Sequence, residues 1–153
     1  MPKVDLDAIE ETNRTGYPPP FDSPVAGRWY RRLAPATGLT KLGASYVRLE
    51  PGAWSSQRHW HDGEDELVIM IEGEAALIED GSEAILRAGD VAAFPKGVVN
   101  GHHLVNRSDA PCLFVAISGG EQAGGAYADI DMMFSADGKY LHKDGTPYEA
   151  SRA

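Results

Sequence analysis

Two histidines separated by one residue, followed closely by carboxylates, form the stretch best suited to chemistry. It reads QRHWHDGEDE, with His59, His61 and, at its end, Glu66. In a β-strand, residues i and i+2 point to the same face, so the two imidazoles would project side by side. Neutral imidazole is a common protein ligand for zinc, iron, nickel and manganese. The spacing is typical of half of a metal site, although a solvated loop would also accommodate it.

Glu66 opens the apolar run ELVIMIEG. If Glu66, Val68 and Met70 share one strand face, that face points to the interior of the domain. An ionised carboxylate is costly there unless it is paired or bound to a metal. This pattern favours Glu66 as a third ligand.

A second pair of histidines follows in NGHHLVN. Alternation along a strand places His102 with Leu104 on one face and His103 with Val105 on the other. One of the two histidines must therefore face inward. Three imidazoles and one carboxylate are a suitable set for a divalent transition metal with open positions.

The segments that must position these residues are short and rich in β-branched and aromatic side chains. Runs of this kind, cut by Gly, Pro, Asp and Asn, predict an all-β sandwich or barrel. The runs are RWYRRLA, GASYVRLE, DELVIMIEG, EAALIED, EAILRAG, DVAAFPKG, GHHLVNRSD and CLFVAIS.

Three junctions between these runs have the composition of hairpin turns. They are Gly73, the pair Asp80-Gly81, and the segment NRSDAP that leads to Cys112. We therefore expect antiparallel sheets, with a hairpin at each junction.

The chain divides into three parts without a second domain. Residues 1–28 contain YPPPF, which fits neither a helix interior nor a central strand, and predict an extended N-terminal arm. Residues 29–120 hold the barrel strands. Residues 121–153 carry two Asp-Gly turn signals and predict a C-terminal hairpin or ordered arm.

Two spaced motifs resemble those of the cupin superfamily of small β-barrels. The first superfamily motif is Gly, five residues, His-x-His, three or four residues, Glu, six residues, Gly. Here it runs from Gly52 through His59, His61 and Glu66 to Gly73, with one extra residue before the first histidine.

The second motif is Gly, five residues, Pro-x-Gly, two residues, His, three residues, Asn. Here it runs from Gly89 through PKG to Asn106, with two extra residues before the histidine. Counting back from Asn106 implies His102 rather than His103 as the ligand, and the insertion leaves both open. The resemblance covers roughly residues 40–118.

The resemblance implies a double-stranded β-helix (jelly-roll) barrel that holds one divalent metal ion, whether zinc, iron, manganese or nickel. The implied ligands are His59, His61, Glu66 and His102. It favours a metal-dependent enzyme of dioxygenase, isomerase or lyase type, acting on a small organic acid or a sugar-like substrate. The alternative is a non-catalytic module that binds or senses a small molecule. No catalytic base is singled out; a tyrosine or Glu66 could serve.

Polar and aromatic residues near the motifs are candidates for lining a substrate pocket. These are Arg48, Trp54, Arg58, Phe94 and His103. Arg48 would neutralise a substrate carboxylate if it points inward, and could equally pair with a structural acid.

Composition excludes several classes of partner. The formal net charge of −9 gives no broad basic surface for nucleic acid or an anionic membrane. The N-terminus does not resemble a signal peptide, and no apolar run is long enough to span a bilayer, so we expect a cytoplasmic protein. The single cysteine, Cys112, reads as a buried apolar residue. The arms and exposed sheet edges favour a homodimer.

Overall fold

The alternating runs form antiparallel strands in the computed structural model, which describes residues 2–149. Strands β1 to β6 are Arg28–Arg32, Gly43–Leu49, His59–His61, Glu64–Glu72, Glu74–Glu79 and Ser82–Arg87. Strands β7 to β12 are Val91–Phe94, His103–Val105, Cys112–Gly120, Gly125–Tyr127, Met133–Phe134 and Tyr140–Leu141. Helical pieces are short: the 3₁₀ turns Leu6–Ala8 and Ser23–Val25, and helix α1, Leu33–Thr37.

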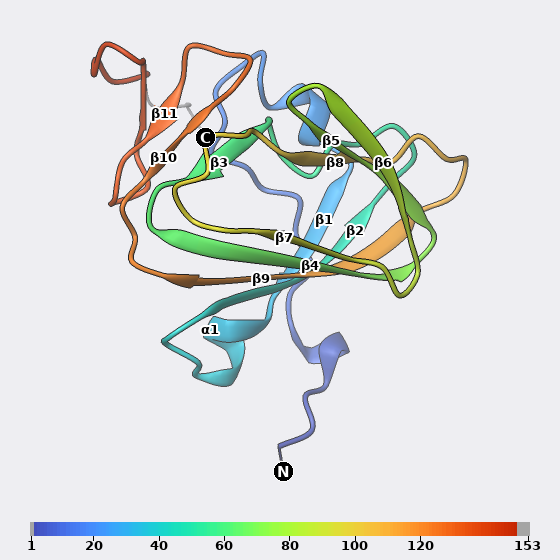
Figure 1. The fold of residues 1–153 in the computed structure, drawn as a ribbon. Coiled ribbons are helices and arrows are strands. Elements are labelled where there is room, and N and C mark those ends of the chain that lie inside the picture. Colours follow the sequence, from blue (N-terminus) through green and yellow to red (C-terminus); the bar gives the residue numbers. More distant parts are fainter. Residues whose placement is uncertain (1, 150–153) are drawn as a thin grey trace.

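The strands build two facing layers (Figure 1). One layer is a five-stranded sheet in the order β1-β2-β9-β4-β7. The other combines the sheet β6-β5-β8 with the sheet β12-β11-β10-β3, which a bridge between His59 and His102 connects. This arrangement is the double-stranded β-helix that the sequence predicted.

An apolar core fills the space between the layers. Its buried members include Leu49, Met70, Leu104 and Phe114, and Cys112 is fully buried, as predicted. Val68 and Met70 point into this core from β4. Glu66 lies two residues before Val68 on the same strand, so alternation turns its carboxylate toward the interior as well.

The predicted hairpins are partly wrong. Asp80-Gly81 does join the paired strands β5 and β6. Gly73 and the NRSDAP segment instead connect strands of different sheets, because β5 pairs with β8, whereas β4 pairs with β9. Gly73 has φ of 73°, and a Cβ there would lie 3.0 Å from Cys112 Cβ. The chain thus turns a tight corner between the layers at this point.

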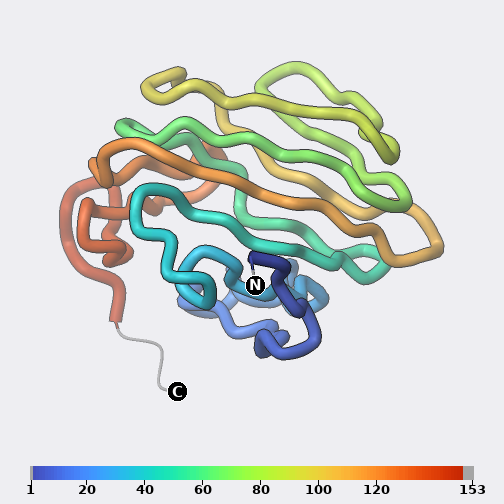
Figure 2. Tube along the Cα trace, turned by 90° about the horizontal axis from the view of Figure 1, so that it is seen from below, coloured from blue at the N-terminus to red at the C-terminus, as the bar shows by residue number. Residues whose placement is uncertain are grey.

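Both arms pack against the barrel. The N-terminal segment runs beside β1 through a bridge between Thr12 and Tyr30 (Figure 2). Tyr17 stacks on Tyr140, with ring centroids 5.3 Å apart, and both belong to a second apolar cluster with Tyr127. Within the predicted C-terminal segment, 121–153, β11 and β12 pair antiparallel, and residues 150–153 lie outside the described part of the chain.

The strand predicted over RWYRRLA ends early, at Arg32, where α1 begins. Among residues 2–149, no helix has both the length and the apolar character needed to cross a membrane.

Candidate metal centre

Three strands bring the predicted ligands together. β3 carries His59 and His61, β4 carries Glu66, and His102 lies directly before β8. The backbones of His59 and His102 exchange two hydrogen bonds, of 3.2 and 3.0 Å. Residues about forty positions apart in the sequence are therefore adjacent across the junction of two sheets.

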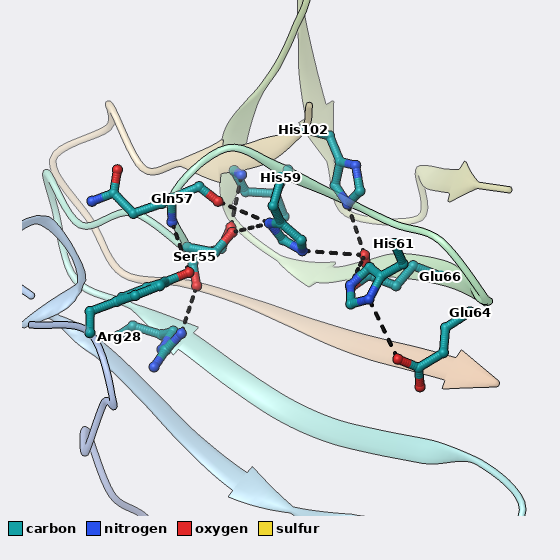
Figure 3. Close-up of polar contacts among 11 residues, drawn as sticks. Arg28, Ser55, Gln57, His59, His61, Glu64, Glu66 and His102 are labelled. Atoms are coloured by element: carbon teal, nitrogen blue, oxygen red, sulfur yellow. Dashed lines mark hydrogen bonds and ion pairs between the residues drawn. The ribbon is translucent and has the colours of Figure 1, made fainter. Parts of the chain in front are cut away.

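The three histidines converge on one carboxylate oxygen, Oε2 of Glu66 (Figure 3). This oxygen lies 2.8 Å from His102 Nε2, 3.2 Å from His61 Nε2 and 3.6 Å from His59 Nε2. Ligand atoms of His59, His61 and Glu66 all lie within 4.8 Å of one another. His61 Nδ1 lies 3.4 Å from a carboxylate oxygen of Glu64.

The tautomer of His59 shows that a cation fits here. His59 Nδ1 lies 2.9 Å from the carbonyl oxygen of Gln57. A carbonyl only accepts, so Nδ1 carries the hydrogen, and Nε2 is the ring nitrogen left to bind a metal on the side of Glu66. Nε2 and the carboxylate oxygen, 3.6 Å apart, could therefore bind one cation together. The donor set, imidazole nitrogen and carboxylate oxygen, suits a divalent transition metal.

Electrostatics keep Glu66 and His102 in the forms that a metal requires. Burial alone would raise the pKa of Glu66, but hydrogen bonds with His102 and His61 hold it well below its ordinary value. Burial lowers the pKa of His102. Burial would also lower the pKa of His61, but Glu66, with Glu64 and Asp62, outweighs it and raises that pKa, so a metal would have to displace a proton from His61. Phe94 stacks on His102, with ring centroids 3.6 Å apart, and fixes the orientation of the ring.

The cluster lines a cavity of about 490 Å³ inside the barrel. Phe94 and His103, two of the predicted pocket residues, also line it. His103 does not join the cluster: its Nδ1 donates to the carbonyl oxygen of Ser56 at 2.8 Å, and burial lowers its pKa. The structure thus places His102, and not His103, beside Glu66.

Three predicted pocket residues lie elsewhere. Arg48 pairs with Glu11 at 2.7 Å and with Glu50 on the outer face of the sheet, which is the second of the two alternatives considered for it. The reason is register, because Arg48 lies opposite Trp29 on the face turned away from the core.

Arg58 binds both carboxylate oxygens of Asp129, at 2.8 and 2.9 Å, and also Asp80. Trp54 packs edge-on against His103, with ring centroids 4.8 Å apart, and does not line the cavity. Each of the three side chains therefore has a structural role.

Sequence reasoning missed the cationic part of the cavity wall. Arg28, Tyr30 and Arg32 of β1 line the cavity, together with Arg14 from the N-terminal arm. The sequence RWYRR could have predicted this, because alternate residues of a strand share a face and Arg28, Tyr30 and Arg32 therefore point the same way.

Comparisons with known proteins agree with this architecture. The family model described as "Cupin domain" matches residues 45–118. The crystal structure of a sugar phosphate isomerase from a cupin superfamily, from Silicibacter pomeroyi, superposes with a TM-score of 0.90. The two sequences are 43% identical, and the match covers 97% of this chain and 98% of that one.

Two further relatives are more distant. A putative sugar phosphate isomerase from Acidithiobacillus ferrooxidans has a TM-score of 0.69 and 22% identity over 82% of this chain and 81% of that one, a likeness of fold. Germin-like protein subfamily 2 member 1 from Arabidopsis thaliana is 35% identical over 86 residues, which is 52% of this chain. The matched region spans only 38% of that plant protein.

Proposed function

This chain belongs to the cupin superfamily, and we propose that it is a metal-dependent isomerase that acts on a phosphorylated sugar. The observation that carries the proposal is the convergence of three histidines and Glu66 on the wall of a cavity large enough for such a substrate. The 43% identical relative, which aligns along nearly its whole length, supports the choice of reaction among those the fold can host.

His59, His61, Glu66 and His102 would hold one divalent ion, such as zinc, iron, manganese or nickel. Bound there, the ion would supply Lewis acidity that polarises a carbonyl group and the neighbouring hydroxyl. The hydrogen bond from His59 Nδ1 to Gln57 keeps the lone pair of Nε2 directed at the site. Phe94 excludes water from one face of His102.

His103 is positioned to move the proton. Its Nδ1–H is held by Ser56, so Nε2 presents a lone pair, and among residues 2–149 no hydrogen bond occupies that nitrogen. Isomerisation removes a proton from the hydroxyl-bearing carbon and returns one to the former carbonyl carbon. The hydroxyl proton passes to the carbonyl oxygen, so the reaction needs no oxidant or reductant.

The first test is the metal content of the untagged protein by plasma mass spectrometry, beside a His59→Ala/His61→Ala variant. We expect close to one ion per chain in the parent and almost none in the variant. His142→Ala, which removes the remaining histidine, is the matched control and should keep the metal, because His142 contacts Asp131 and Tyr148 instead. A parent that stays metal-free after anaerobic reconstitution would refute the metal site.

The second test follows interconversion of aldose and ketose phosphates by NMR in D₂O. We expect turnover with deuterium incorporation, reduced about 10²–10⁴-fold in His103→Gln, as is usual when a general base is lost. Tight binding of sugar phosphates by the metal-loaded protein without turnover would replace the isomerase with the non-catalytic binding module.

Homodimeric assembly stays a prediction, which light scattering on the purified protein can check.

A further inference from the structure

The cavity is cationic although the protein is strongly acidic. Its lining includes Arg28 and Arg32, Arg14, which pairs with Glu10 at 3.0 Å, and a single carboxylate, Glu66. The whole chain carries a formal net charge of −9. A low-dielectric cavity with an excess of positive charge concentrates anions from solution.

Arg28 and Arg32 reach the cavity because of the alternation of β1. Arg28, Tyr30 and Arg32 occupy every second position, and the intervening Arg31 points to the outer face. Arg31 lies within 4.0 Å of carboxylates from the N-terminal arm. Within residues 2–149, no carboxylate lies within 4.0 Å of Arg28 or Arg32.

The guanidinium of Arg28 is incompletely bonded. Nη1 donates to the carbonyl oxygen of Ser55 at 2.9 Å, and Nη2 lies 3.5 Å from the carbonyl oxygen of Arg14. Its Nε is buried and, among the described residues, has no hydrogen-bond partner. A buried donor without an acceptor is unfavourable, and the contacts of Nη1 and Nη2 are to carbonyl oxygens, so they leave the guanidinium charge without a counterion.

We propose that Arg28, flanked by Arg32 and Arg14, binds the phosphate group of the substrate, a choice of anion that rests on the proposed function. A phosphate supplies the counter-charge that Arg28 and Arg32 lack within the described residues, and the planar guanidinium suits paired hydrogen bonds to an oxyanion. The lone backbone contacts of Nη1 and Nη2 pre-orient the group without neutralising it.

This assignment sets the direction of the substrate in the cavity. Figure 3 shows Arg28 well separated from the cluster of His61, Glu66 and His102. The phosphate therefore lies at β1, and the opposite end of the sugar lies at the histidines. Phosphate binding then does not need the metal site.

The test measures binding of inorganic phosphate by calorimetry to the full chain. The proteins are the parent, Arg28→Met, Arg28→Lys and the control Arg87→Met, which removes the same charge from an exposed residue that pairs with Glu74. We expect phosphate affinity to fall tenfold or more in Arg28→Met, as for loss of a charge-assisted hydrogen bond. Arg28→Lys should recover part of it, and Arg87→Met should match the parent.

A second arm separates this proposal from the proposed function. The same titration is made with the metal-free His59→Ala/His61→Ala variant, which should bind phosphate as the parent does. Binding that disappears there, or that survives in Arg28→Met with an unchanged melting temperature, overturns the phosphate assignment. Absence of isomerase activity alongside Arg28-dependent phosphate binding overturns the isomerase and leaves the anion site standing.

Discussion

The two faces of the β1–β2 ladder use the same residue type for opposite purposes. On the outer face, Arg31 and Arg48 meet Glu11 from the N-terminal arm, and Arg48 also pairs with Glu50. On the inner face, Arg28 and Arg32 line the cavity and have no carboxylate partner in the described part of the chain. The role of an arginine in this barrel thus depends on whether an acid reaches it.

The N-terminal arm creates this difference. It pairs with β1 through Thr12 and Tyr30 and supplies Glu11 to the outer face. A few residues later the same arm supplies Arg14 to the cavity wall, where it pairs with Glu10. The acids of the arm thus meet the outer-face arginines and leave Arg28 and Arg32 available for an anion.

The largest change in the free energy of unfolding should come from a buried apolar residue next to the inner-face arginines. Leu49 lies opposite Arg28 in the β1–β2 register and is fully buried. We expect Leu49→Ala to lower the free energy of unfolding by about 2–5 kcal/mol, because it leaves a cavity in the core. Urea denaturation measures the change, and Val99→Ala, at a surface position 68% exposed, should cost about 0.5 kcal/mol or less. Equal costs for the two variants would contradict this account of the inner face.

An intermediate effect should distinguish the two arginines directly. Arg48→Met leaves Glu11 and Glu50 close together without their cation, so we expect a loss of about 1–2 kcal/mol in the free energy of unfolding. Arg28→Met should change it by less than about 1 kcal/mol, because it removes one backbone hydrogen bond and also a buried donor that has no acceptor.

Phosphate affinity should respond in the opposite order, unchanged in Arg48→Met and weakened in Arg28→Met. Thermal melts and calorimetry on both variants measure the two quantities. If Arg28→Met were the more destabilising variant, Arg28 would be a structural residue and the contrast between the faces would be lost.

The smallest effect concerns Arg58 at the rim of the barrel. Its side-chain hydrogen bonds lower the pKa of Asp129. A carboxyl whose folded pKa lies below its unfolded value, about 3.9, contributes stability above that value and loses it as pH falls through the folded pKa. Because Asp129 is largely exposed, its contribution at neutral pH should be at most about 1 kcal/mol.

Melting temperatures between pH 7 and pH 2.5 check this, with Asp129→Asn beside Asp109→Asn. The first variant should lose part of the acid-side slope and the second should keep it. Identical slopes would show that Arg58 does not stabilise the Asp129 carboxylate.

Sequence analysis predicted most where the spacing of the candidate ligands agrees with the two-residue alternation of a β-strand. The barrel, its antiparallel pairing and the convergence of His59, His61 and Glu66 follow from motifs in which ligand spacing and alternation agree. Pairing between distant strands is not local, which is why Gly73 was predicted as a hairpin and proved to be a corner between sheets. A turn residue indicates where the chain bends but not which strand it then meets.

The same limit explains the misplaced pocket residues. Arg48 was predicted to line the pocket because it lies near the first motif. It instead forms an ion pair with Glu11, which is distant in the sequence. Arg28 belongs to no motif, and its importance arises from burial without an acceptor. Such a property exists only once the chain has folded.

The stacking of Tyr17 on Tyr140 has a consequence for the order of folding. All barrel strands except β12 lie between these two residues in the sequence, so closing this contact carries a large loop entropy and should come late. The histidines and Glu66 lie within a much shorter stretch, 59–102, and can assemble earlier. We therefore expect the proposed metal ligands to come together before the N-terminal arm docks on the C-terminal part of the chain through the two tyrosines.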